Sequence, residues 1–68
     1  MRIFIRPRNS DSYDRVVGRA IEILQDAQIP SAQARETIHS RPGVFIDPAD
    51  LPEVVAIPGW AGLRVAMN

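Results

Sequence analysis

The sequence predicts an α+β domain in which two helices cover one face of a four-stranded antiparallel sheet. Three observations support this prediction. Apolar and polar residues alternate near both ends and in the middle of the chain, which is the pattern of half-buried strands. A segment between them has apolar residues at helical spacing. The six prolines fall at the boundaries of these segments, as expected of residues that interrupt regular structure.

Length and composition indicate a single small domain, residues 1–68. The chain contains no Cys, and its eight basic residues, all Arg, balance eight acids to give a formal net charge of zero. A net charge of zero argues against long-range attraction to nucleic acid or membranes. No apolar run approaches the roughly 18 residues of a membrane span, and the apolar stretch near the N-terminus is too short for a signal peptide. We therefore expect a cytoplasmic protein.

The first half of the chain predicts a strand followed by a long helix. The segment RIFIR (residues 2–6) alternates, and Pro7 ends the strand. Ser10 or Asp11 can cap the helix. Its apolar residues recur at helical spacing: Tyr13, Val16, Val17, Ala20, Ile23, Leu24 and Ala27. Pro30 lies just past the helix, where proline is common.

Residues 32–40 are compatible with either a strand or a short helix capped by Ser31. Their alternation would place Ala34, Glu36 and Ile38 on one face and Arg35, Thr37 and His39 on the other. We interpret the segment as a strand, because Pro42-Gly43 predicts a type II turn and residues 44–46 (VFI) predict a strand after it. Two strands around a turn make a hairpin.

The last part of the chain predicts a short helix and a final strand. Asp50 and Glu53 have the spacing of a capping box, and Pro52 suits a first helical turn. Pro58-Gly59 ends the helix. The final strand is predicted from the alternating residues Leu63, Val65 and Met67. The resulting order, βαββαβ, is that of the ferredoxin-like fold, in which the first and third strands are central and one sheet face is open.

The open sheet face is the expected binding surface. The partner-binding residues that we predict there are Arg2, Phe4, Arg6, Arg35, His39, Phe45 and Arg64, with Thr37 on the same face. Phe4 and Phe45 would be neighbours on the central strands, and aromatic side chains among arginines outside a core are typical of binding surfaces. Alternatively, the two rings form a cross-strand pair that stabilises the sheet and binds nothing, or the face joins two copies in a homodimer.

The sequence provides little support for catalysis or for a cofactor. His39 is the only histidine, and a lone imidazole without Cys supports neither a metal site nor a catalytic triad. Asp47, Asp50 and Glu53 recur at spacings of three residues, but capping explains Asp50 and Glu53 more simply than a cation does. Trp60 is interpreted as an anchor at the edge of the core. We predict a non-enzyme with no cofactor and no metal.

From Arg41 onward, the segment RPGVFIDPADLPEVVAIPGWAGLRV resembles the second half of the subtilisin-propeptide-like protease inhibitors. In that family a strand leads to a short helix, a proline-containing turn and a final strand. The resemblance implies a ferredoxin-like fold whose open face, here that of Phe4 and Phe45, lies on a protease. Two features depart from the family: Arg64 stands where an acid is usual, and only residues 66–68 extend beyond the strand as a tail.

Three functions are compatible with these observations. The first is a non-catalytic interaction module, inhibitory if its partner is a protease, that docks a protein through the open face. The second is single-stranded nucleic acid binding through the same aromatic and Arg face, although the signature run of the RNA-recognition fold is missing. The third is a dimeric, ligand-responsive regulatory domain.

Overall fold

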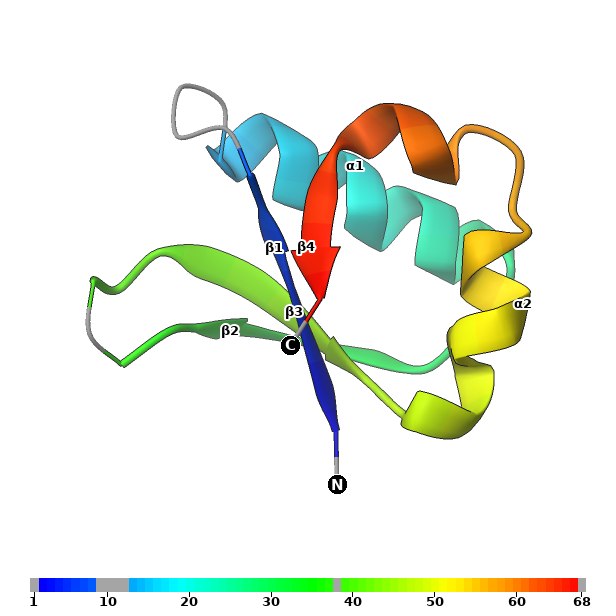
Figure 1. The fold of residues 1–68 in the computed structure, drawn as a ribbon, viewed down its shortest axis with the longest axis horizontal. Coiled ribbons are helices and arrows are strands. Elements are labelled where there is room, and N and C mark those ends of the chain that lie inside the picture. Colours follow the sequence, from blue (N-terminus) through cyan, green and yellow to red (C-terminus); the bar gives the residue numbers. More distant parts are fainter. Residues whose placement is uncertain (1, 9–12, 38, 68) are drawn as a thin grey trace.

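The computed structural model describes residues 2–8, 13–37 and 39–67, and its four strands form one antiparallel sheet in the order β2-β3-β1-β4 (Figure 1). Along the chain the elements are β1 (Ile3–Pro7), α1 (Tyr13–Asp26), β2 (Ser31–Arg35), β3 (Pro42–Ile46), the 3-10 turn η2 (Pro48–Asp50), α2 (Leu51–Val55), the 3-10 turn η3 (Trp60–Leu63) and β4 (Val65–Met67). The predicted fold class, with the first and third strands central, is confirmed. The expected caps Ser10 and Asp11, and Ile38, lie outside the described residues.

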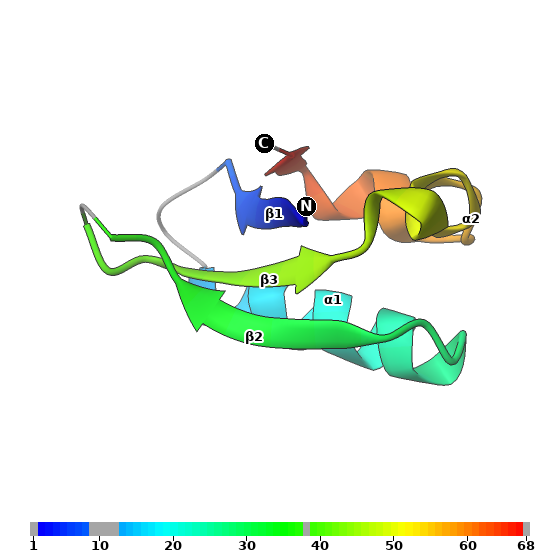
Figure 2. The ribbon, with the colours of Figure 1, turned by 90° about the horizontal axis from the view of Figure 1, so that it is seen from below.

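The core lies between α1 and the sheet. The helix packs against the two central strands and lies behind the sheet in Figure 2. Its buried residues follow the predicted helical spacing: Val17, Ala20, Ile23 and Leu24. From the sheet, Ile5, Val44 and Ile46 are each at most 2% exposed. Among the described residues no helix lies on the opposite face of the sheet, which is therefore open, as predicted.

The second half of the chain is less regular than a full βαββαβ domain. Helix α2 has only five residues, flanked by η2 and η3, and lies beyond one end of the sheet (Figures 1 and 2). It still contributes the fully buried Val54 to the core, and Trp60 is 4% exposed, which confirms its role as an anchor. The final strand begins only at Val65, because Arg64 ends η3 in the left-handed conformation.

The turn of the β2–β3 hairpin lies earlier than predicted. The strand predicted over residues 32–40 is confirmed only in its first part, because β2 ends at Arg35. Pro42 and Gly43 belong to β3, so the type II turn prediction is wrong. The amide of Glu36 donates to the carbonyl of Arg41 (3.0 Å), and the amide of Ser40 donates to the carbonyl of Glu36 (3.1 Å). Ser40, with φ of 53°, takes the left-handed conformation that the turn requires.

The observed register is opposite to the predicted faces of β2. Ala32 pairs with Phe45, which places Ala32, and Ala34 two residues on, on the open face. Arg35 pairs with the buried Pro42 and lies on the helix side of the sheet. Because side chains alternate along a strand, a change of register by one residue moves all of them to the other face. The predicted place of Arg35 on the open face is therefore wrong.

Asp47, and not Asp50, caps the second helical segment. The Asp47 carboxylate accepts a hydrogen bond from the amide of Ala49 (2.9 Å), whereas Asp50 makes no side-chain capping bond, so the predicted capping box is wrong. We expect Asp47→Ala to lower the free energy of unfolding by about 1 kcal/mol. The matched change Asp50→Ala should cost less than half of this. Urea denaturation of both variants makes the comparison, and equal losses would contradict the assignment.

Candidate protein interface on the open sheet face

An aromatic cluster of Phe4, Phe45 and Arg2 occupies the middle of the open face. Phe4 and Phe45 pair directly across β1 and β3, and their ring centroids lie 5.0 Å apart at an angle of 55°. The guanidinium carbon of Arg2 lies 4.5 Å from the centroid of the Phe45 ring. Both rings are half-buried. The cross-strand contact expected for the phenylalanines is therefore present, and such pairs contribute about 0.5–1.5 kcal/mol beyond burial.

Gly43 allows the Phe4 ring to approach the backbone of β3 closely. A Cβ atom at this position would overlap the Phe4 ring and would lie 2.8 Å from the carbonyl oxygen of Ile5. The backbone of Gly43 does not have a positive φ, so the close approach, and not turn geometry, requires glycine here. The same residue that predicted a turn from the sequence is thus part of the platform under the aromatic cluster.

The rest of the open face is formed by small side chains and a second cation. Ala32 and Ala34 contribute from β2, and Arg6 lies opposite Ala66 across β1 and β4. None of the paired open-face positions in the register carries an acid, whereas Arg2 and Arg6 carry positive charge. The strand positions of the face therefore carry cations and no acid, although Asp47 lines a hollow at its border and the whole chain has no net charge.

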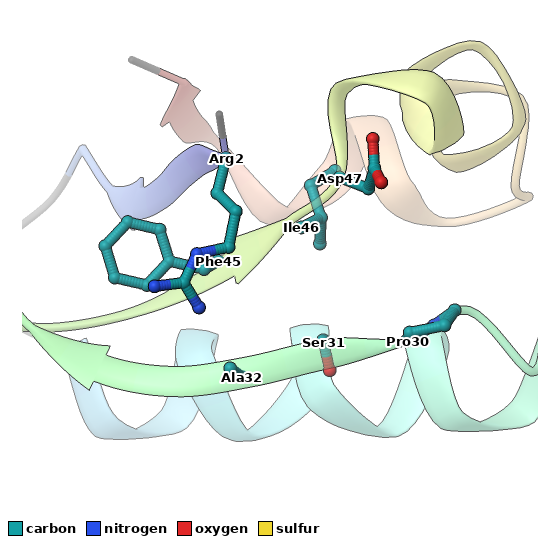
Figure 3. A pocket seen from close by; sticks show the side chains of 7 residues that line it. All are labelled: Arg2, Pro30, Ser31, Ala32, Phe45, Ile46 and Asp47. Carbon is teal, nitrogen blue, oxygen red and sulfur yellow. The ribbon is translucent and has the colours of Figure 1, made fainter.

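A hollow of about 260 Å³ borders the aromatic cluster where β2 begins (Figure 3). The residues that line it are Arg2, Pro30, Ser31, Ala32, Phe45, Ile46 and Asp47. Most of this lining is apolar, and the Asp47 carboxylate points away from the Arg2 guanidinium, which extends toward Phe45 (Figure 3). The volume falls below the roughly 300–1,000 Å³ of pockets for small molecules. It is better suited to a single side chain of a partner.

The structure brings together four of the seven predicted site residues: Arg2, Phe4, Arg6 and Phe45. The other three lie elsewhere. Arg35 donates a hydrogen bond to the carbonyl of Ser40 from the helix side of β2. His39 is exposed near Thr37 in the hairpin turn, beyond the sheet. Arg64 precedes β4 and lines a separate hollow.

Sequence reasoning missed Ala32 and Pro30, which line the hollow. Neither is a typical anchor residue, and the predicted alternation, with Ala34 on the helix side, placed Ala32 there too. The signal that was available is the alternation of Ala32 with Gln33 in a strand that ends at Arg35.

Together, the fold and the site define a small α+β domain with an open, aromatic and cationic sheet face. Comparison of the chain with protein-family models, curated proteins and solved structures found no match. Within residues 2–8, 13–37 and 39–67, no three His, Cys, Asp or Glu side chains are grouped so that they could hold a metal ion. No helix in these ranges has the length and apolar character needed to cross a membrane.

Proposed function

We propose that this chain is a non-catalytic interaction module that binds a protein partner through its open sheet face. The observation that carries the proposal is the aromatic cluster of Arg2, Phe4 and Phe45, placed beside an apolar hollow on a face that no described helix covers. Aromatic and Arg side chains are enriched among the residues that dominate binding energy at protein interfaces. The hollow next to them accepts an apolar side chain of the partner.

The charge of the face selects the chemistry of the partner. A carboxylate near Arg2 and Arg6 complements the two cations, and bidentate contacts with Arg are strong. A standard interface buries roughly 800 Å² of each partner, which is a large share of the 4592 Å² of accessible surface on this small domain. The partner is therefore an acidic segment with an apolar anchor, held in a weak or transient complex.

Substitution of Ala32 tests the proposed interface. Ala32→Glu places an acid in the hollow, and we expect it to weaken binding of an acidic partner peptide at least about tenfold, or 1.4 kcal/mol. The probe is a peptide that carries Asp or Glu beside an aromatic residue, selected from a displayed library and measured by fluorescence anisotropy. The matched control is Gln33→Glu, the next residue of the same strand, which pairs with Val44 and is exposed on the other face.

Three further outcomes would count against the interface. Peptides that bind Ala32→Glu as tightly as the original chain use another surface. Binding that survives the double variant Phe4→Ser, Phe45→Ser with the fold intact, as judged by circular dichroism, also excludes the aromatic cluster. The Gln33→Glu variant should bind the peptide with unchanged affinity. If its affinity fell as much as that of Ala32→Glu, negative charge near β2 would weaken binding without any contact in the hollow.

The resemblance to propeptide-like inhibitors implies that the partner is a protease. In that case the chain would inhibit the protease by binding it through the open face. The assay is titration of the chain against subtilisin with a chromogenic substrate. Inhibition that Ala32→Glu weakens would identify the chain as an inhibitor acting through the open face. Unchanged protease activity at an excess of chain would confine the proposal to binding without inhibition.

Single-stranded nucleic acid is the second candidate partner, because the rings of Phe4 and Phe45 lie on the central strands beside Arg2 and Arg6. Bases stack on aromatic side chains in this position in other sheet surfaces. An oligouridine probe separates the two proposals: its affinity should fall steeply between 50 and 200 mM salt if phosphates are bound, as roughly expected from counterion release. A dimer, the third candidate, is detected by light scattering over a concentration range.

A further inference from the structure

A second hollow lies at the opposite edge of the sheet, where β4 meets α2 and η3. Its volume is about 330 Å³. Two large apolar side chains are exposed among the described residues, Val55 at 49% and Met67 at 40%, and both line it. Trp60, Ala61 and Val65 complete its apolar part. Exposed apolar side chains that gather in one concave place, rather than scatter over a surface, mark binding sites.

Within residues 2–8, 13–37 and 39–67, no strand pairs with the outer side of β4. β4 is the last strand of the sheet order, so only β1 pairs with it. The amide of Arg8 donates to the carbonyl of Arg64 (3.1 Å), so the backbone N–H and C=O groups of Arg64 point toward β1. Because these groups alternate along an antiparallel strand, those of Val65 and Met67 point outward. An edge of this kind is a template for an added strand.

Arg64 occupies a position whose backbone favours glycine. Its φ is 53°, in the left-handed region that side chains other than glycine rarely adopt. Strained residues of this kind are concentrated at functional sites, where the side chain is retained for its contacts. Arg64 lines the hollow together with Arg8, and these two are its only charged lining residues. Both carry positive charge.

We infer that the hollow at β4 binds an extended segment of a partner protein in which acidic and apolar residues alternate. The segment adds to the outer edge of β4, its apolar side chains contact Val55, Trp60 and Met67, and its carboxylates pair with Arg8 and Arg64. The two cations of the hollow complement the carboxylates of such a segment. The site is separate from the open face and does not depend on the function proposed for it.

Trp60 provides a specific signal for occupancy, because it is the only tryptophan of the chain and lines this hollow. The probe is the acetylated and amidated hexapeptide Glu-Val-Glu-Val-Glu-Val, titrated while Trp60 emission is recorded. We expect a saturable change in emission. The peptide with Lys in place of Glu should bind at least about tenfold more weakly. No change at millimolar peptide, or equal binding of the two peptides, would overturn the inference.

Two variants locate the bound peptide. Val55→Glu places an acid in the hollow and should weaken binding at least about tenfold, whereas the exposed neighbour Ala56→Glu should not. Arg64→Gly removes a cation where glycine suits the backbone, so affinity should fall severalfold without loss of thermal stability. If the Val55→Glu and Arg64→Gly variants both bind the peptide with unchanged affinity, the peptide does not bind in this hollow. Ala32→Glu on the open face should leave the Trp60 signal unchanged, which separates this test from that of the proposed function.

Discussion

Leu24→Ala is expected to lower the free energy of unfolding by about 2–5 kcal/mol. Leu24 is 0% exposed and lies at the centre of the core between α1 and the sheet. A domain of 68 residues has a total stability of about 3–10 kcal/mol. Removal of this side chain therefore takes away a large part of the stability, and the variant should be partly unfolded at 37 °C.

Urea denaturation followed by circular dichroism measures this loss. The matched control is Val55→Ala, which shortens an apolar helical side chain that is 49% exposed and should change stability by no more than about 0.5 kcal/mol. Similar losses in both variants would show that burial by α1 does not dominate the stability. If Leu24→Ala does not fold at all, Leu24→Met, which nearly conserves the volume, should retain the fold at a cost below about 1.5 kcal/mol.

Gly43→Ala is expected to destabilise the domain by about 1–3 kcal/mol, although alanine is an ordinary residue in a strand. The added methyl group overlaps the Phe4 ring, and it also lies 2.8 Å from the backbone oxygen of Ile5, which cannot turn away. The comparison is Gly18→Ala in the middle of α1. A Cβ there meets no atom within 4 Å, so this change should stabilise the chain by about 0.5–1 kcal/mol.

A double variant shows how much of the Gly43 effect comes from the aromatic ring. In a Phe4→Ala background the ring is gone, and Gly43→Ala should cost less by about 0.5 kcal/mol or more, while the contact with the Ile5 carbonyl persists. Thermal unfolding of the four chains completes the cycle. Additive losses would show that Phe4 does not rest on Gly43. A stabilising effect of Gly43→Ala alone would contradict the geometry of the open face.

The aromatic cluster has consequences for stability as well as for binding. Phe4 and Phe45 contact each other, and Arg2 covers part of Phe45. A loss of binding in a phenylalanine variant therefore mixes two effects, because the platform itself is weakened. Ala32 and Gln33 provide a cleaner test, since both are exposed and neither contributes to the core. Ala32→Glu and Gln33→Glu introduce the same side chain at adjacent positions of β2. The two variants therefore differ mainly in the face of the sheet on which the new Glu lies.

The features that the sequence alone determined are those set by local periodicity and by burial on one side. The helical spacing of Val17, Ala20, Ile23 and Leu24 predicts α1, and the alternation of Ile3 and Ile5 predicts β1. These patterns also lead to the antiparallel sheet, because the element order leaves few ways to cover one face. Phe4 and Phe45 followed as neighbours on the central strands, and the structure pairs them directly.

Only the tertiary structure decided the register of the β2–β3 hairpin, and with it the composition of the open face. Pro42 and Gly43 have the local signature of a turn, but β3 needs Gly43 where the Phe4 ring crosses it. The turn formed instead around Ser40, which lacks a strong turn signal. This contact joins residues far apart in the sequence, so no local pattern records it. The same register placed Ala32, and not Arg35, beside Phe45, because side chains in a strand alternate and only the pairing with β3 decides which set faces the helix.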